Sequence, residues 1–409
     1  MQQIVFDEPY EFIPPYRGTF WALLFRHLLK GHLRRSNGIT ESECRGTERL
    51  RKSLDAGHGI ILAPNHCRPS DPMAMGLLNR EMNINLFTMA SWHVFKSDWL
   101  TAFVIRRLGA FSVYREGMDR QALNCAIEIL EQATRPLVIY PEGVITRTND
   151  RLAVLMEGTA FIARTAAKRR EKQNPPGKVV IHPVAMRYQF LGDLESTLAP
   201  VLSDIETRLS WRPQRHLSLI DRIRKLGTAL LTLKEVEYVG QPQTGSIYRR
   251  LEGLIDHLLV PLEKEWLNGQ GTGDVVARVK NLRIAILSDM VKKEIPEEEC
   301  ERRWRQLEDV YLAQALSLYP RHYVMPNSPP ERLLETVERF EEDLTDAARV
   351  HGPMRLIIEV GEAIEVSPKR PKGEKLDPVM LELESALRSQ LDNLADELAR
   401  ERGTTSRSK

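Results

Sequence analysis

Short apolar runs alternate with amphipathic stretches of roughly a dozen residues through residues 1–190. Such runs are typical of strands buried on both faces, and the stretches between them carry the three- and four-residue spacing of helices. The pattern predicts an α/β fold with a mostly parallel or mixed sheet flanked by helices. The expected strands are 60–64, 84–90, 110–114, 136–140 and 179–185, and the expected helices are 17–30, 41–56, 72–80, 95–108, 119–133 and 156–170.

The sequence pattern changes after residue 190, where charge-rich helical sequence replaces the short apolar runs. Strand-like sequence returns at 354–360 and 363–366, and a last helix begins at Asp377-Pro378 with leucines along one side. We therefore predict three parts. They are an α/β core with N-terminal amphipathic helices (1–190), a helical insert of unknown role late in the chain (191–352), and returning core strands with a C-terminal helix and a disordered tail from Gly403 (353–409).

Two stretches have the composition of lipid contacts. The expected helix 17–30 carries aromatic and aliphatic side chains on one side, with arginine and lysine around them. It either packs on its own domain or lies on a membrane surface. Residues 208–225 are rich in arginine and form either a solvated basic face or a contact for anionic lipid headgroups or an acidic carrier protein.

Charge balance and cysteine spacing narrow the function classes. A formal net charge of +2 over 409 residues demands no polyanion, so we expect no nucleic-acid partner. The four cysteines lack zinc-ligand spacing, and reduced thiols are the expected state. The first residues do not read as a signal peptide and no apolar window reaches about 18 residues, so we expect a cytoplasmic protein, peripheral to the membrane and without a transmembrane segment.

The first predicted strand delivers two titratable side chains to the carboxyl edge of the sheet, where proteins of this class place reactive groups. His66 and Asp71 are too far round a helix to share a face, but the intervening loop can fold the carboxylate back onto the imidazole. A carboxylate there would fix the ring tautomer of a general base. Alternatively, Asp71 is only the cap of a helix that begins at Pro72.

Two other interpretations start from the same loop. Cys67 could act as a nucleophilic thiol beside His66, and His66 and Asp71 could bind a metal together with His93 or His182. Adjacent side chains usually point apart, and metal-ligand spacing is missing, so neither interpretation is favoured and we expect no metal site.

Four blocks follow one another along the chain: Asn65-His66-x4-Asp71, Gly109 to Arg115, Pro141-Glu142-Gly143, and an apolar strand around Pro183. In this order and at these separations they resemble the glycerolipid acyltransferase family, typified by lysophosphatidate and glycerol-3-phosphate acyltransferases. Residues 360–366 resemble the closing Gly-Glu-Pro-Ile strand of that family, with Ala363 in place of proline. The resemblance covers residues 18–190 and 353–366 and leaves the insert outside.

The resemblance implies transfer of a fatty acyl group from an acyl thioester, either acyl-CoA or acyl carrier protein, to a hydroxyl of a glycerol-phosphate or lysophospholipid acceptor. It makes His66 the general base and Asp71 its orienting group, and it implies no cofactor beyond the acyl donor as co-substrate. A guanidinium suits the phosphate end of the acceptor because it stays charged and pairs with phosphate through two hydrogen bonds. The implied substrate-binding residues are Arg115, Glu142 and Gly143, and the implied structural residues near the site are Asn65 and Pro183.

The third block departs from the family. The family commonly has Glu-Gly-Thr-Arg where this chain has Glu142-Gly143-Val144-Ile145-Thr146-Arg147. The second phosphate-facing arginine is therefore displaced or absent, and Arg147 is the candidate substitute. Two alternatives stay open: a non-catalytic phospholipid-binding module on the same fold, and a transacylase or acyltransferase with a non-phosphate acceptor.

Overall fold

The computed structural model describes residues 8–290, 295–371, 373–374 and 376–407. The chain forms two compact units. The sheet unit consists of residues 12–113, 119–192 and 350–409, and the helical unit consists of residues 1–11, 114–118 and 193–349. Among the described residues, no helix combines the length and apolar character needed to cross a membrane.

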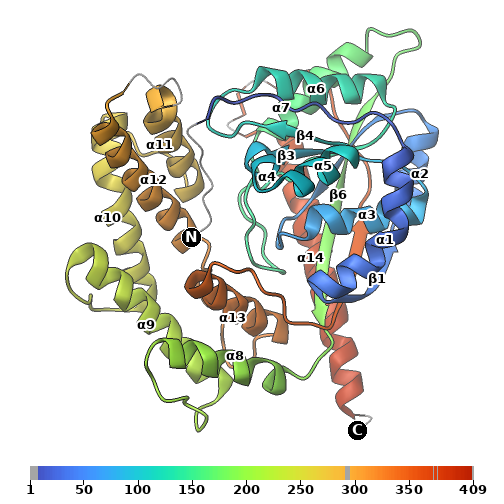
Figure 1. The fold of residues 1–409 in the computed structure, drawn as a ribbon. Coiled ribbons are helices and arrows are strands. Elements are labelled where there is room, and N and C mark those ends of the chain that lie inside the picture. The colour runs from blue at the N-terminus through green and yellow to red at the C-terminus, as the bar shows by residue number, and fades with distance from the viewer. Residues whose placement is uncertain (1–7, 291–294, 372, 375, 408–409) are drawn as a thin grey trace. The chain divides into compact units, whose positions relative to one another are not determined.

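Eight strands of the described chain form one sheet in the sheet unit (Figure 1). They are β1 (Ile39–Arg45), β2 (Gly59–Pro64), β3 (Phe87–Ser91), β4 (Ala110–Val113), β5 (Leu137–Val138), β6 (Val179–Phe190), β7 (Met354–Val360) and β8 (Ile364–Glu365). Their order is β1-β7-β6-β2-β5-β3-β4, with β8 paired to β6. Strand β6 is antiparallel to β7 and β8, and the other pairs are parallel. This mixed sheet with flanking helices confirms the predicted fold class.

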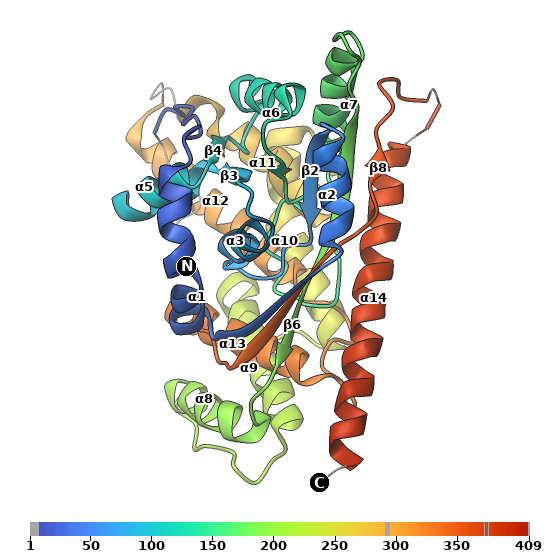
Figure 2. The same cartoon turned by 90° about the vertical axis from the view of Figure 1, so that its right-hand side faces the viewer.

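Helices cover both faces of the sheet. They are α1 (Phe20–Asn37), α2 (Thr47–Asp55), α3 (Asp71–Met82), α4 (Trp92–Lys96), α5 (Trp99–Arg107), α6 (Arg120–Gln132), α7 (Gly158–Arg170) and α14 (Pro378–Arg407). On one face, α6, α7 and α14 share a buried cluster with Ile61 and Ile181. The leucine side of α14 is buried in this cluster, and Figure 2 shows α14 running alongside β6. On the other face, Ser53 of α2 hydrogen-bonds the imidazole of His182 at 2.9 Å.

Two of the predicted helices are wrong. Residues 41–56 do not form one helix, because 39–45 are strand β1 and only Thr47–Asp55 are helical. Strand β1 pairs with β7, for example Cys44 with Ile358, and a partner so distant in the chain leaves no local signal. The first helix does not end at Gly31 but continues to Asn37, where Gly38 takes the left-handed conformation with φ of 64°.

Two further boundaries differ from the prediction. The helix expected at 95–108 is divided into α4 and α5, because Asp98 caps α5 by accepting a hydrogen bond from the Thr101 N–H at 2.8 Å. The disorder expected from Gly403 is also wrong, since α14 continues to Arg407. The last two residues of the predicted tail lie outside the described residues.

The helical unit contains α8 (Leu194–Arg208), α9 (Leu219–Val239), α10 (Ile247–Leu267), α11 (Val275–Met290), α12 (Glu297–Ser317) and α13 (Pro330–Thr345). Leucine, isoleucine and valine side chains of α10, α11 and α12 form its buried cluster. The helical character of the predicted insert is therefore seen over most of its length.

Three successive turns of the helical unit are built in the same way. A glutamate near the end of one helix receives two hydrogen bonds, from Nε and Nη2 of an arginine one turn into the next helix, at 2.6–3.0 Å. We call these contacts ion-pair clips, and they join Glu206 to Arg222, Glu235 to Arg250, and Glu263 to Arg278. The glutamates are 29 and 28 residues apart in the sequence, so the clips mark an internal repeat that sequence reasoning missed.

Candidate active site

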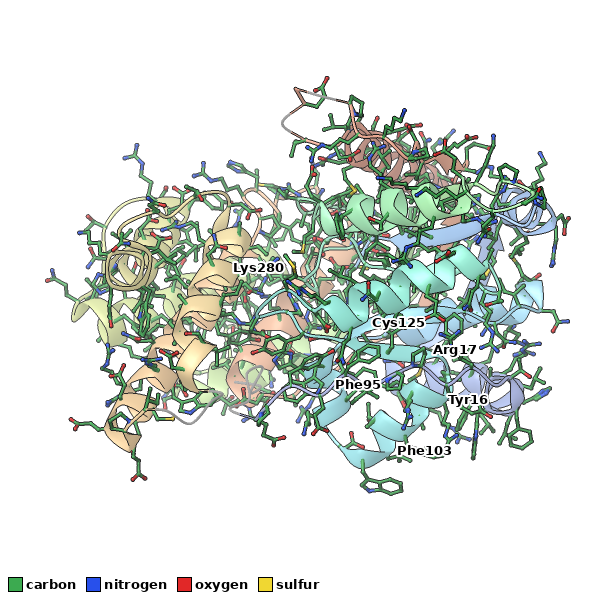
Figure 3. All side chains as sticks on the ribbon, turned by 90° about the horizontal axis from the view of Figure 1, so that it is seen from above. Tyr16, Arg17, Phe95, Phe103, Cys125 and Lys280 are labelled. Carbon is green, nitrogen blue, oxygen red and sulfur yellow. The ribbon has the colours of Figure 1, made fainter. Side chains whose placement is uncertain are left out.

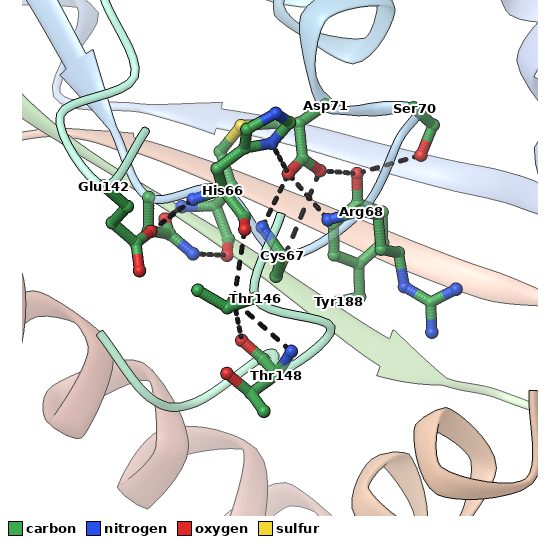
Figure 4. A network of polar contacts seen from close by, with 11 residues as sticks. His66, Cys67, Arg68, Ser70, Asp71, Glu142, Thr146, Thr148 and Tyr188 are labelled. Atoms are coloured by element: carbon green, nitrogen blue, oxygen red, sulfur yellow. Dashed lines mark hydrogen bonds and ion pairs between the residues drawn. The ribbon is translucent and has the colours of Figure 1, made fainter. Parts of the chain in front are cut away.

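His66 and Asp71 lie on the loop between β2 and α3, and their side chains meet (Figure 4). His66 Nδ1 is 3.0 Å from Asp71 Oδ2. The Asp71 side chain is fully buried, whereas that of His66 is 13% exposed. Because Asp71 engages Nδ1, Nε2 is the ring nitrogen that is left for proton transfer. The loop therefore places an imidazole and a carboxylate together, as the sequence predicted.

Three further donors hold the Asp71 carboxylate. The backbone N–H groups of Cys67 and Arg68 each donate to Oδ2 at 2.8 Å, and the Tyr188 hydroxyl donates to Oδ1 at 2.7 Å. An ionised carboxylate only accepts hydrogen bonds, so this set of donors suits the charged form. The interpretation of Asp71 as a helix cap is wrong, because it is the first residue of α3 and its oxygens turn back to the loop.

Glu142 fixes the backbone of His66 from the segment that follows β5. The His66 N–H donates to Oε1 and the Ala153 N–H donates to Oε2, both at 2.6 Å. The Thr146 N–H donates to the His66 carbonyl at 2.8 Å and holds it from the same segment. Both oxygens of this buried side chain are thus engaged by backbone N–H groups, and the substrate contact that the resemblance implied for Glu142 stays a prediction.

The surroundings of Glu142 also set its protonation. Burial raises the pKa of Glu142 from 4.5 to about 8, and the Asp71 charge adds to the rise. The backbone N–H groups of Ala153 and His66 act in the opposite direction, because they favour the ionised form. Glu142 therefore titrates close to neutral pH.

The Tyr140 ring lies against one face of the His66 imidazole. Its ring lies 4.2 Å from the His66 ring, tilted by 32°. The Tyr140 hydroxyl oxygen is buried and has no hydrogen-bond partner among the described residues. Burial raises the pKa of this phenol well above its ordinary value, so the hydroxyl stays protonated. The stacked ring restricts the orientations that the imidazole can take.

Two asparagines fasten the site loops to β6. Asn65 donates to the Met186 carbonyl at 3.1 Å and accepts from the Met186 N–H at 2.7 Å. Asn149 makes the same pair of contacts with Tyr188, at 2.6 and 2.7 Å. Pro183, also on β6, pairs with Ala63 of β2, and its carbonyl accepts from the Gly361 N–H at 2.7 Å. These contacts tie the loop after β2, and the loop that holds Glu142, to one rigid strand.

Gly143 and Arg147 both have left-handed backbone conformations, with φ of 68° and 57°. At Gly143 the positive φ favours glycine, and a Cβ atom there would also lie 2.3 Å from Met156 Sδ, so the methionine side chain would have to move. Arg147 follows Thr146 in the same loop and its side chain is half-buried. The substrate contacts expected of these two residues stay predictions.

Arg115 belongs to the helical unit, in the segment 114–118. There Glu116 accepts a hydrogen bond from Arg283 of α11, and both of these side chains are buried. Burial, and next the charge of Arg283, lower the pKa of Arg115 to about 10, while Glu116 opposes the shift. Arg283 was not predicted, because it lies in the insert, outside the family resemblance.

Cys67 and His182, on which the thiol and metal interpretations depend, are both buried. Cys67 is buried, with Sγ 4.0 Å from Asp71 Oδ1, and all four cysteines are free thiols. Both ring nitrogens of His182 are engaged, one by Ser53 and the other by the Gly361 carbonyl at 2.9 Å. Within the described ranges, no group of three or more histidine, cysteine, aspartate and glutamate side chains is placed to hold a metal.

The fold is thus an α/β protein with a histidine–aspartate pair at the carboxyl end of a central strand, where proteins of this class place reactive groups. Residues 41–187, which include His66, Asp71, Glu142 and Pro183, match the model of the Acyltransferase family. This match agrees with the resemblance predicted from the four blocks, and it supports a general acyltransferase function. No curated protein matches the chain.

Proposed function

We propose that the protein is an O-acyltransferase that moves a fatty acyl group from acyl-CoA or acyl carrier protein to the hydroxyl of a glycerol-phosphate or lysophospholipid acceptor. The observation that carries this proposal is the contact of 3.0 Å between His66 Nδ1 and Asp71 Oδ2. The family match supplies the acyl chemistry, and the paired side chains supply a base for the acceptor hydroxyl.

In the proposed step, His66 Nε2 takes the proton of the acceptor hydroxyl as its oxygen attacks the thioester carbonyl carbon. The tetrahedral intermediate collapses with cleavage of the C–S bond, and the thiolate leaves. The imidazolium returns its proton to the thiolate, so an ester and a free thiol form and His66 is neutral again. Asp71 keeps the proton on Nδ1 and stabilises the imidazolium. The thioester is already activated, so no covalent enzyme intermediate is needed.

A thiol-release assay tests this proposal. The purified protein is given acyl-CoA or acyl carrier protein as donor, and lysophosphatidate, glycerol 3-phosphate or a neutral acylglycerol as acceptor. His66→Ala should reduce thiol release to the background rate, whereas His216→Ala, at an exposed histidine of the helical unit, should not change it. Wild-type turnover in His66→Ala would refute the mechanism.

The same assay separates the alternatives. Phospholipid binding without thiol release from any donor–acceptor pair would favour a non-catalytic module. Release with the neutral acceptor alone would favour a non-phosphate acceptor.

We further propose that this enzyme works at an anionic membrane surface, which α1 and α5 contact. Phe20, Leu28 and Trp99 expose 64%, 62% and 79% of their surface. The two helices are joined by aromatic contacts, since the Trp21 and Phe103 rings lie 5.2 Å apart and the Arg107 guanidinium covers both. Apolar and aromatic side chains beside arginines suit a lipid interface. Figure 3 shows Phe103 on the same side of the sheet unit as Tyr16.

Sedimentation with vesicles tests the membrane contact. Vesicles containing phosphatidylserine should carry down the wild type and carry down much less of a Trp99→Ser/Leu100→Ser variant. Equal sedimentation of the two proteins would contradict this contact.

A further inference from the structure

We propose that Arg283 of the insert and Arg115, which lie in the same unit, together bind a phosphate monoester. The assignment of this phosphate to the acyl acceptor rests on the proposed function. The binding of a phosphate monoester at these two arginines does not depend on the proposed function.

Arg283 lies in the middle of α11, on a helix that is held firmly in place. Leu282, Ile286 and Leu287 of the same helix are buried in the cluster with α10 and α12. The Arg283 side chain is itself 8% exposed, and its Nη2 donates to Glu116 Oε1. Since Glu116 directly follows Arg115 in the chain, α11 brings its guanidinium to the segment that carries the predicted phosphate ligand.

Arg283 differs from the structural arginines of the same unit. In each ion-pair clip, the arginine directs both Nε and Nη2 to one carboxylate, so the fork is fully used. Arg283 meets Glu116 through Nη2, and its buried Nε has no hydrogen-bond partner among the described residues. A buried N–H without an acceptor is unfavourable, and a phosphate oxygen is an acceptor that a guanidinium binds strongly.

The charges of the two arginines point to the same kind of ligand. Burial and the charge of Arg283 lower the pKa of Arg115, and the charge of Glu116 offsets only part of this shift. A dianionic phosphate would offset both effects. Two planar guanidinium groups can also share the oxygens of one phosphate group.

Calorimetric titration with glycerol 3-phosphate tests the proposal, with inorganic phosphate and glycerol as the comparison ligands. We expect glycerol 3-phosphate to bind, glycerol not to bind, and Arg283→Ala to weaken binding about 10- to 100-fold, the value of a charged hydrogen-bond pair. Arg283→Lys should give an intermediate loss, because it keeps the charge and lacks the fork. Arg305→Ala, at an exposed arginine of α12, should leave binding unchanged.

Glu116→Gln distinguishes a phosphate site from a purely structural ion pair. Removing the negative charge beside two arginines should tighten glycerol 3-phosphate binding, whereas loss of a structural ion pair would weaken it as much as Arg283→Ala does. Unchanged affinity in Arg283→Ala, or weaker binding in Glu116→Gln, overturns the proposal. Weaker glycerol 3-phosphate binding in Arg147→Ala, together with unchanged binding in Arg283→Ala, would assign phosphate binding to Arg147 instead.

Kinetics then separate this inference from the proposed function. Arg283→Ala should raise the KM for lysophosphatidate and leave the KM for the acyl thioester unchanged. If the protein binds glycerol 3-phosphate through Arg283 but releases no thiol, the proposed function is refuted and the phosphate site at Arg283 stands. If Arg283→Ala releases thiol with an unchanged KM for lysophosphatidate, the proposed function stands. Arg283 then does not bind the phosphate of the acceptor.

Discussion

Replacing Asp71 by asparagine should separate the charge of this residue from its role in holding the loop. The amide oxygen can take the place of Oδ2 and accept from His66 Nδ1 and from the N–H groups of Cys67 and Arg68. The amide NH₂ group then faces Tyr188, whose hydroxyl can rotate and accept instead of donating. The variant keeps the loop and the ring tautomer, and it loses only the negative charge.

The distance in the structure sets the expected size of the effect. At 3.0 Å, an imidazolium and a carboxylate attract each other by about 5.5 kcal/mol with an effective dielectric constant of about 20. The amide dipole retains part of this, so we expect a loss of about 3–5 kcal/mol in the transition state, or about 10²- to 10⁴-fold in kcat. Asp71→Ala should also cost about 3–6 kcal/mol of stability, because the four donors to the carboxylate lose their acceptor.

Thiol-release kinetics at saturating acceptor and urea unfolding measure the two effects separately. Asp71→Asn should unfold close to the wild-type urea midpoint and turn over slowly, whereas Asp71→Ala should fail in both assays. Turnover of Asp71→Asn within about fivefold of the wild type would show that the charge is not needed. Equal destabilisation of the two variants would refute the proposed exchange of hydrogen bonds.

Two more predictions concern buried carboxylates. The pKa of Glu142 in the folded protein, about 8, lies above its ordinary 4.5, so the folded state holds a proton that the unfolded chain releases between these values. The contribution of Glu142 to stability therefore falls as the pH rises through this window, by at most about 1.4 kcal/mol per pH unit. Glu142→Gln should remove this slope in urea unfolding measured across the window, and an unchanged slope would contradict the assignment. In the second ion-pair clip, Glu235→Gln should destabilise the helical unit by about 3–5 kcal/mol, because the guanidinium of Arg250 is left without its partner, and Glu235→Leu/Arg250→Met should recover most of the loss. Exposed Glu237→Gln is the matched control, and a loss in Glu235→Gln no larger than in this control would show that the clip adds nothing.

The sequence predicts best those features whose cause is local. The apolar run of β2 and the cap at Asp119, which accepts from the Ala122 N–H at 2.9 Å, depend on residues a few positions apart. The meeting of His66 and Asp71 is also local, since one short loop brings them together. Such features follow from periodicity, capping and chain reach.

The remaining features depend on contacts between distant parts of the chain. The Tyr188 hydroxyl reaches Asp71 across 117 positions, and no spacing rule connects them. Strand β1 was predicted as part of a helix, and the edge of β7 with which it pairs lies more than 300 positions away in the chain. The contacts of Glu142 were not predicted for the same reason, because the donors to its carboxylate are backbone N–H groups, which a sequence does not distinguish from one another.

Each ion-pair clip joins a helix to the next one in the chain, from α8 to α9, α9 to α10 and α10 to α11. The unit also has contacts between helices that are not consecutive, because α12 packs on α10 and α13 packs on α8. A helix that loses its clip is therefore still held by packing against other helices. The clips fix the geometry of the turns between successive helices, and a change of a few residues within one of these turns would break the clip that closes it.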